Sequence, residues 1–376
     1  MLYRKLGSTG LEVSQLGFGA MRLPMIGTGK DQKVNRDLAI PMIRRALDAG
    51  VNYVDTAVGY CHHDSQYALG EAIRGRRDTV IVSTKNPYYG DDEKKWRENL
   101  ENSLKRIGVD YIDIYNHHGV NWKSYQEHVE PHMGKWMHKA KNEGLIRHVC
   151  CSFHDNNDAL MKLVDSGYPE VITLQYNLFD RQLEPGIARA HEKGIGVVVM
   201  GPVGGGRLVG PSAAFGPAAA GAGRMPELAM RFVLANPNVS VALSGMSTMQ
   251  QVEENVAVAC DGAVLSEADK AAIDRQLAAL RKLADLYCTG CGYCMPCPSN
   301  VDIRGVFDCY NHARVYGLLD SARDRYAGMT HRWSDGKDVT AAVCTDCGAC
   351  EPKCPQKIEI RKQLKEAHEM LGKKAT

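Results

Sequence analysis

Eight of the thirteen cysteines in this 376-residue chain form two quartets near its carboxyl end. Each quartet is a C-x2-C-x2-C run closed by a further cysteine and a proline, Pro298 in the first and Pro355 in the second. A three-cysteine run lets one loop wrap thiolates around an iron–sulfur cubane, while the fourth cysteine ligates the other cluster of a pair. We predict two [4Fe–4S] clusters, one held by Cys288, Cys291, Cys294 and Cys354, the other by Cys344, Cys347, Cys350 and Cys297.

Other uses of these cysteines are zinc binding and disulfides. Zinc sites combine pairs of C-x2-C rather than triplets with a trailing Cys-Pro. Disulfides need an oxidising compartment, and the chain begins Met-Leu-Tyr-Arg-Lys without an apolar signal segment, so we expect a cytoplasmic protein. The first motif has two residues between its third and fourth cysteines where the second has three, which leaves one cluster plus an idle motif as a further alternative.

Four side chains that could move a proton or polarise a carbonyl follow short apolar runs: Asp55, Tyr60, Lys85 and His118. A lysine beside a tyrosine lowers the pKa of the phenol, and a carboxylate paired with that lysine fixes the ammonium in place. An imidazole can hydrogen-bond a carbonyl oxygen and polarise it. Together the four predict a pocket for carbonyl reduction. Each residue taken singly also fits an ordinary structural role. Asp55 could cap a helix, Tyr60 could be an aromatic residue at the rim, Lys85 could be an exposed charge at a strand end, and His118 could be a packed histidine.

The elements that must position these side chains lie between residues 15 and 260. The predicted strands are 15–20, 52–55, 79–85, 111–116, 148–152, 171–175, 196–200 and 239–243, and the predicted helices are 36–49, 65–74, 92–107, 125–142, 156–166, 185–193, 225–235 and 249–259. Eight of each in alternation is typical of a (β/α)8 TIM barrel, in which the carboxyl ends of the strands face the active site. An open doubly wound sheet is the alternative.

Outside this alternation, residues 2–14 predict a hairpin that caps the bottom of the barrel, and residues 211–223 a low-complexity loop. A Leu/Ala-rich helix at 266–286, with Ser266 as its N-cap, leads to the cysteine module. Further helical patterns cover 302–316, 318–327 and 360–373. We expect a barrel domain at 1–262, a linking helix at 263–287, and a small, mostly α-helical, ferredoxin-like iron–sulfur domain at 288–376.

The composition excludes other classes of protein. The formal charge is +2, from 46 basic and 44 acidic residues, so no basic footprint for nucleic acid is indicated. No apolar run approaches the roughly 18 residues of a membrane span. Hydrophobic residues make up 44% of the chain and charged residues 24%, as in ordinary globular proteins.

Three sequence blocks resemble the catalytic blocks of the aldo-keto reductases: residues 55–60 (DTAVGY), 83–85 (STK) and 111–118 (YIDIYNHH). With the two cysteine motifs, the chain is similar to the ferredoxin-fused branch of that family. The resemblance implies that Tyr60 is the general acid, tuned by Lys85 and Asp55, and that His118 orients the carbonyl. It also implies a nicotinamide cofactor, NADPH or NADH, extended across the barrel mouth. No G-x-G-x-x-G follows a strand, so a Rossmann mode of binding is unsupported.

The same resemblance implies a set of cofactor contacts. Ser152 and Gln175 match the residues that hold the nicotinamide amide, whereas Phe153 stands where the family usually has Asn. The family usually binds the 2′-phosphate of NADPH with basic side chains. Gly245 and Gln251 occupy those positions here, which leaves the choice between NADH and NADPH open. The predicted cofactor-binding residues are Gly19, Ala20, Met21, Asp55, Ser152, Gln175, Met200, Gly201, Val203, Gly205, Ser244, Gly245, Met246, Ser247, Gln251, Glu254 and Asn255.

We therefore predict an NAD(P)-dependent oxidoreductase that interconverts a carbonyl and an alcohol on a small polar or sugar-like substrate, with a fused two-cluster electron-transfer module. A hydride carries two electrons whereas a cluster moves one. The alternative is accordingly a flavin-dependent electron-transfer reductase whose barrel binds FMN or a redox substrate. A ferredoxin- or flavoprotein-type electron partner is expected. A purely regulatory role is disfavoured by the four candidate catalytic residues.

Overall fold

The computed structural model describes residues 1–27, 31–178, 180–204, 225–262, 265–284, 288, 294–314, 317–329, 337–354 and 358–373. Contacts divide these residues into two compact units. The first holds the described residues up to 204 together with those from Ala229 to 262, and the second holds the rest. The predicted loop at 211–223 lies outside the described residues. The domain bounds proposed from the sequence stay a prediction.

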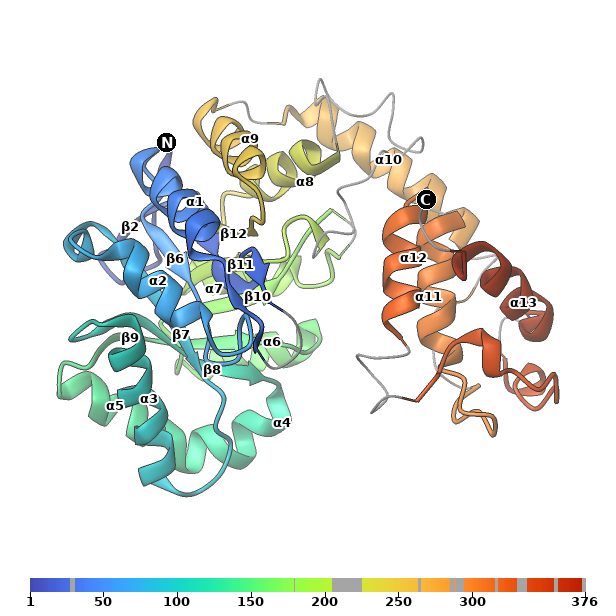
Figure 1. Cartoon of the computed structure of the whole chain (residues 1–376), viewed down its shortest axis with the longest axis horizontal. Helices are drawn as coiled ribbons and strands as arrows, with labels where there is room; N and C mark the ends of the chain where they lie inside the picture. The colour runs from blue at the N-terminus through green and yellow to red at the C-terminus, as the bar shows by residue number, and fades with distance from the viewer. Residues whose placement is uncertain are drawn as a thin grey trace. The chain divides into compact units, whose positions relative to one another are not determined.

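The first unit is a closed barrel of eight parallel strands, in which each strand pairs with the next and β12 closes on β3 (Figure 1). The strands are β3 (Leu16–Gly19), β6 (Tyr53–Asp55), β7 (Ile81–Asn86), β8 (Ile112–Val120), β9 (Ile146–Phe153), β10 (Val171–Gln175), β11 (Gly196–Met200) and β12 (Val241–Gly245). The TIM barrel is confirmed, and the open doubly wound sheet is wrong.

Helices surround this barrel, as Figure 1 shows. They are α1 (Arg36–Asp48), α2 (Ser65–Ile73), α3 (Glu93–Ile107), α4 (Trp122–Ser124), α5 (Gly134–Asn142), α6 (Asn157–Asp165), α7 (Glu184–Glu192), α8 (Met225–Leu234) and α9 (Met249–Cys260), with the 3-10 turns η1 (Ala20–Arg22) and η3 (Arg77–Thr79) and the short strands β4 (Met25–Ile26) and β5 (Lys33–Val34) between them. The helix predicted at 125–142 is instead a π-helix, η4 (Tyr125–Met133), followed by α5. Pro131 lies inside η4 and lacks the N–H that a regular α-helix needs there.

Apolar side chains fill the barrel interior at the amino-terminal ends of the strands. The cluster comprises Tyr53, Ile81, Ile114, Cys150, Val171, Val198, Val241 and Leu243, together with Leu6 and Val13. Leu6 and Val13 belong to the amino-terminal hairpin, in which β1 (Tyr3–Lys5) pairs antiparallel with β2 (Glu12–Ser14). Because side chains alternate along a strand, residues two and four places beyond each core position also face inward, nearer the carboxyl end. That alternation decides which side chains reach the barrel mouth.

The second unit is mostly helical, as predicted. Its helices are α10 (Glu267–Ala284), α11 (Ile303–Arg314), α12 (Leu319–Gly328) and α13 (Ile360–Leu371), with the 3-10 turns η7 (Ala341–Val343) and η8 (Glu351–Lys353). The Ser266 hydroxyl accepts the Asp269 amide at 3.1 Å, and the Asp269 carboxylate accepts the Ser266 amide at 2.9 Å. This reciprocal cap begins α10 where the sequence placed it.

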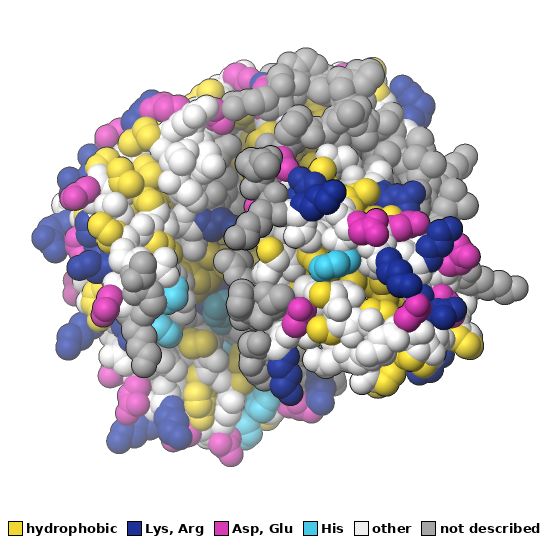
Figure 2. Space-filling model, turned by 45° about the vertical axis from the view of Figure 1, so that its right-hand side comes forward, with side chains coloured by type: hydrophobic (Ala, Val, Ile, Leu, Met, Phe, Trp, Pro, Cys, Tyr) yellow, Lys and Arg dark blue, Asp and Glu magenta, His cyan; other side chains and the backbone are white. Residues whose placement is uncertain are grey.

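The surface agrees with the near-zero net charge. Figure 2 shows Lys and Arg side chains interspersed with Asp and Glu over the visible face. Among the residues that the structure describes, no helix has the length and apolar character needed to span a bilayer.

Candidate functional site

A buried ion pair lies on the inner face of the barrel near the carboxyl ends of β6 and β7. The Lys85 ammonium lies 2.5 Å from a carboxylate oxygen of Asp55 and donates a second hydrogen bond to the Thr56 carbonyl at 3.0 Å. The hydroxyl of Ser83 donates to the other Asp55 oxygen at 2.7 Å. The two charged side chains are 2% and 5% exposed. Burial is the largest single influence and lowers the pKa of Lys85, but the charges and hydrogen bonds of Asp55 and Tyr60 together exceed it, so the net pKa is raised.

Tyr60 lies above this pair, in the loop that follows β6. The Lys85 ammonium is 5.0 Å from the centre of the Tyr60 ring. Burial raises the pKa of Tyr60, and the charge of Lys85 opposes this only in part. The sequence-based prediction of a lowered pKa is therefore wrong, because desolvation exceeds the effect of an ammonium already paired with Asp55. A phenol that stays protonated at neutral pH is suited to donate its proton.

His118 completes the group from β8, with its ring edge-on to Tyr60 at 6.1 Å between centroids. The predicted strand ended at 116, but β8 continues to Val120, so His118 lies within the strand and faces inward two places beyond Asn116. Burial, then the charges of Lys85 and His154, lower the pKa of His118 to about 4. The imidazole is neutral at pH 7 and keeps one N–H to donate.

His117, the neighbour of His118, has a structural role. Its Nε2 lies 2.7 Å from the Tyr168 hydroxyl, and its side chain is buried. Because adjacent residues of a strand point to opposite faces, His117 packs outside the barrel while His118 faces its interior.

Three consecutive residues after Tyr60 adopt left-handed backbone conformations. Cys61, His62 and His63 have φ of 51°, 54° and 68°, although none is glycine. Each such residue costs on the order of 1 kcal/mol, and strain of this kind concentrates at functional sites. The Cys61 thiol lies 3.5 Å from the Met21 carbonyl, so the turn also contacts η1.

The predicted cofactor-binding residues lie along the carboxyl ends of β3, β9, β10, β11 and β12 and in the segments that follow them. Gly19 pairs with Gly245 across β3 and β12, and Ala20 and Met21 continue into η1. Gly201 has φ of 66°, and a side chain there would meet Gln175 at 3.1 Å. Met200, Val203 and Glu254 are partly exposed, whereas Met246 is fully buried. Gly205 lies outside the described residues.

Four of the residues assigned to the adenosine end form two hydrogen-bonded pairs. The Asn255 amide donates to the Ser244 hydroxyl at 2.9 Å, and the Ser247 amide donates to the Gln251 side chain at 2.7 Å. The Ser247 hydroxyl donates to the Arg22 carbonyl at 2.7 Å, which joins α9 to η1. Two neighbours of the site escaped the sequence reasoning: Asn177, which donates to the Gly201 carbonyl at 3.2 Å, and His154. For His154 the available signal was its place two residues after Ser152.

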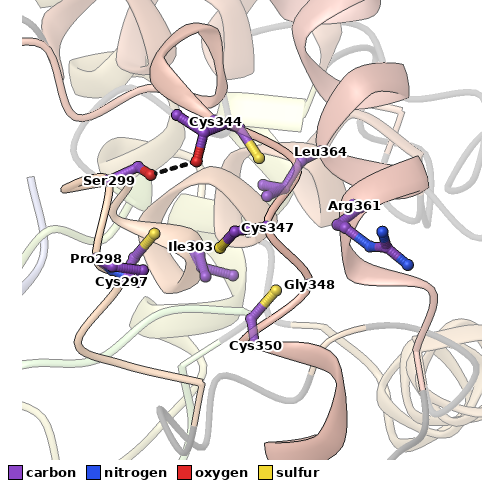
Figure 3. A pocket seen from close by; sticks show the side chains of 11 residues that line it. Cys297, Pro298, Ser299, Ile303, Cys344, Cys347, Gly348, Cys350, Arg361 and Leu364 are labelled. Atoms are coloured by element: carbon purple, nitrogen blue, oxygen red, sulfur yellow. Dashed lines mark hydrogen bonds between the residues drawn. The ribbon is translucent and has the colours of Figure 1, made fainter.

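The second unit brings together one predicted set of cluster ligands. Cys297, Cys344, Cys347 and Cys350 line a single pocket, with Leu364 among its other lining residues (Figure 3). Burial raises the pKa of the Cys350 thiol, and the charges of the nearby Cys297 and Cys344 add to the effect. In the described part of the chain, no three His, Cys, Asp or Glu side chains converge closely enough to hold one metal ion. Four sulfurs spread around a pocket fit a cubane better than a zinc ion.

Three of the four predicted ligands of the other cluster belong to, or pack against, the apolar core of the second unit. Cys294 belongs to the apolar cluster of the second unit, and Cys288 and Cys354 lie against it. Cys291 lies outside the described residues. Of the cysteines not predicted as ligands, Cys150, Cys151 and Cys309 are buried, Cys61 is partly exposed and Cys260 is exposed.

Comparisons with known proteins agree with this division. Residues 15–215 match the model of the aldo/keto reductase family, and residues 287–359 match that of a 4Fe-4S dicluster domain. These matches imply NAD(P)H and two 4Fe–4S clusters and give no support to a flavin.

Individual relatives match the barrel part of the chain. An L-galactose dehydrogenase of Arabidopsis thaliana is 30% identical over 281 residues, covering 68% of this chain and 86% of the relative. An NADH-specific methylglyoxal reductase of Escherichia coli is 26% identical over 303 residues, covering 67% of this chain and 91% of the relative. A solved aldo-keto reductase of Bacillus halodurans in its holo form is 28% identical, has a TM-score of 0.62, and covers 73% of this chain and 96% of its own.

Proposed function

Since the chain belongs to the aldo/keto reductase family and is a carbonyl/alcohol oxidoreductase with a fused 4Fe–4S domain, we propose that it reduces the carbonyl of a small polar or sugar-like substrate with NAD(P)H. The substrate class is supported by the polar side chains of His118, His154 and Gln175 at the open end of the barrel. It is further supported by relatives whose names specify L-galactose and methylglyoxal. The observation that carries the proposal is the buried Lys85–Asp55 pair beneath Tyr60 and His118.

In this mechanism the nicotinamide, when bound, supplies the hydride to the carbonyl carbon. The protein residues stabilise and protonate the carbonyl oxygen. Tyr60 donates its proton as negative charge develops on that oxygen. Lys85 stabilises the resulting tyrosinate, and Asp55 holds the ammonium in position. The neutral His118 donates a hydrogen bond to the same oxygen. Ser152 and Gln175 would hold the nicotinamide amide, and Ser244, Gln251 and Asn255 the adenosine end.

The test is to replace Tyr60 by Phe in protein purified under argon. Oxidation of NADH and NADPH is followed with a panel of ketones, aldehydes and oxidised sugars. We expect Tyr60→Phe to lower kcat by about 10²- to 10⁴-fold and to leave NAD(P)H binding, measured by fluorescence titration, within about threefold. Tyr67→Phe is the matched control, because Tyr67 lies on α2 and is 47% exposed. An unchanged rate in Tyr60→Phe would contradict the assignment.

For the clusters we propose one-electron exchange with a ferredoxin- or flavoprotein-type partner, separate from the hydride step. Cys297, Cys344, Cys347 and Cys350 would hold one cluster, and Cys288, Cys291, Cys294 and Cys354 the other. A hydride delivers two electrons at once whereas each cluster accepts one, so NADH alone should leave the clusters oxidised. Visible absorption recorded after anaerobic addition of NADH, then of dithionite, tests this. Bleaching by NADH alone would refute it.

A further inference from the structure

His154 occupies an inward-facing position at the open end of the barrel, one step beyond the last residue of β9. Ser152 on β9 pairs in register with His118 on β8, and the register then shifts between His118 and Val120. The amide of His154 donates to the Val120 carbonyl at 2.7 Å, so the backbone remains sheet-like past the end of the strand. Because side chains alternate, His154 shares the face of Ser152, while the intervening Phe153, 1% exposed, points away.

Polar and charged neighbours confirm that His154 faces the pocket. Its Nε2 lies 3.4 Å from the Ser152 hydroxyl, a long contact that a better partner can replace. Burial, then the charge of Lys85, lower the pKa of His154, and His154 in turn lowers the pKa of His118. His154, Lys85 and His118 therefore lie within electrostatic range of one another, and burial disfavours the charged form of both imidazoles.

We propose that His154 is a specificity-determining residue that hydrogen-bonds a polar oxygen next to the reacting carbonyl, so that the substrate is an α-hydroxy carbonyl compound. This inference rests on the proposed function. In this arrangement His118 would hydrogen-bond the carbonyl oxygen, and His154 a polar group on the adjoining carbon. A neutral imidazole has one N–H donor and one acceptor nitrogen, which suits a hydroxyl able both to donate and to accept. It offers no charge to bind a carboxylate.

A position toward the substrate is favoured over one toward the cofactor. Ser152, predicted to hold the nicotinamide amide, lies one inward-facing step deeper in the barrel than His154. The electrostatic neighbours of His154 are Lys85 and His118, which belong to the carbonyl pocket. His154 is also more exposed than Ser152, so it lies nearer the entrance.

The experiment compares acetoin with butanone, which differ by one hydroxyl beside the ketone. Steady-state kcat/KM is measured under argon with a saturating nicotinamide cofactor. In His154→Phe we expect the acetoin-to-butanone ratio of kcat/KM to fall by about 10- to 100-fold, because the pocket loses a hydrogen-bond partner for that hydroxyl. The ratio is the readout because it cancels any loss of activity that the two ketones share. His154→Gln, which keeps a donor and an acceptor, should retain part of the preference.

Controls separate the possible failures. His191→Phe makes the same change at an exposed position on α7 and should leave the ratio unchanged. An unchanged ratio in both His154 variants would overturn the proposal. So would a tenfold loss of NAD(P)H affinity at a constant ratio, which would assign His154 to the nicotinamide. If the unmodified protein reduces neither ketone nor any other carbonyl of the panel, the proposed function itself fails.

Discussion

Replacing Asp55 by Asn should destabilise the barrel, because it leaves the Lys85 ammonium buried without its carboxylate. The Lys85 side chain is 2% exposed and its partner lies 2.5 Å away, so the small values typical of surface ion pairs do not apply. Removing one partner of a buried pair costs about 3–5 kcal/mol. The Thr56 carbonyl at 3.0 Å remains as an acceptor but carries no charge to balance the ammonium. We expect the free energy of unfolding at pH 7 to fall by that amount.

The pH dependence of this loss has a defined sign. In the native protein the pKa of Lys85 is raised above its ordinary value, so the stabilisation is fully present below that value and is lost as pH rises through the folded-state pKa. In Asp55→Asn, burial, which is the largest influence, is opposed only by Tyr60, so we expect the pKa of Lys85 to fall below its ordinary value and the unfolded state to bind more protons than the folded state. The stability of the variant therefore rises with pH, and its deficit should shrink toward pH 10.

Urea unfolding at pH 7 and pH 10, followed by tryptophan fluorescence under argon, measures both effects. Three of the four tryptophans (Trp96, Trp122 and Trp136) lie in the barrel and report on it directly. The double variant Asp55→Asn with Lys85→Met removes both charges and should regain most of the lost stability. Asp165→Asn, which breaks an exposed pair on α6, is the control and should change little. A loss under about 1 kcal/mol at pH 7, or a deficit independent of pH, would refute the reasoning.

Further predictions concern pH, strain and iron. Because burial raises the pKa of Tyr60 and that of His118 is lowered to about 4, kcat/KM for reduction should be flat from about pH 5 to 9, and a bend near pH 7 would contradict this. Lys85→Met should move the alkaline limb to higher pH, since Lys85 lowers the pKa of Tyr60. His62→Gly should raise the melting temperature, with a gain of up to about 1 kcal/mol, and His62→Val should lower it. Cys347→Ala should reduce iron from about eight to about four atoms per chain, whereas Cys260→Ala should not.

The sequence was sufficient for features carried by local pattern. The alternation of runs predicted all eight barrel strands, and two of them, β10 and β11, have the predicted bounds. The split of 125–142 was harder to foresee, because periodicity continues through Pro131 while hydrogen bonding does not. The strand at β8 extends four residues past its predicted end, since pairing with β9 overrides the weak propensity of the two histidines and Gly119.

Electrostatic properties of the site could not be predicted from residue types. Reasoning from a lysine beside a tyrosine gave the wrong direction for the net pKa of Tyr60, because desolvation depends on packing around the phenol. His154 carries no motif, and its contribution depends on a register shift between β8 and β9. The position of Cys344, Cys347 and Cys350 beside one pocket follows from their spacing, since they share one loop, whereas Cys297 comes from a distant part of the sequence. Their role as cluster ligands stays a prediction.

The pKa directions together explain why this pocket suits a reaction that creates charge. Before reaction the Lys85–Asp55 pair is balanced, Tyr60 holds its proton, and burial favours the neutral forms of His118 and His154, so these five groups together carry no net charge. Hydride transfer to a carbonyl carbon would place a negative charge on the oxygen and leave a positive charge on the nicotinamide ring. The Tyr60 hydroxyl and the His118 N–H are already placed to receive the negative charge, and the Lys85 ammonium lies behind the phenol. Groups fixed in advance need little reorganisation, and this favours the transition state over the ground state.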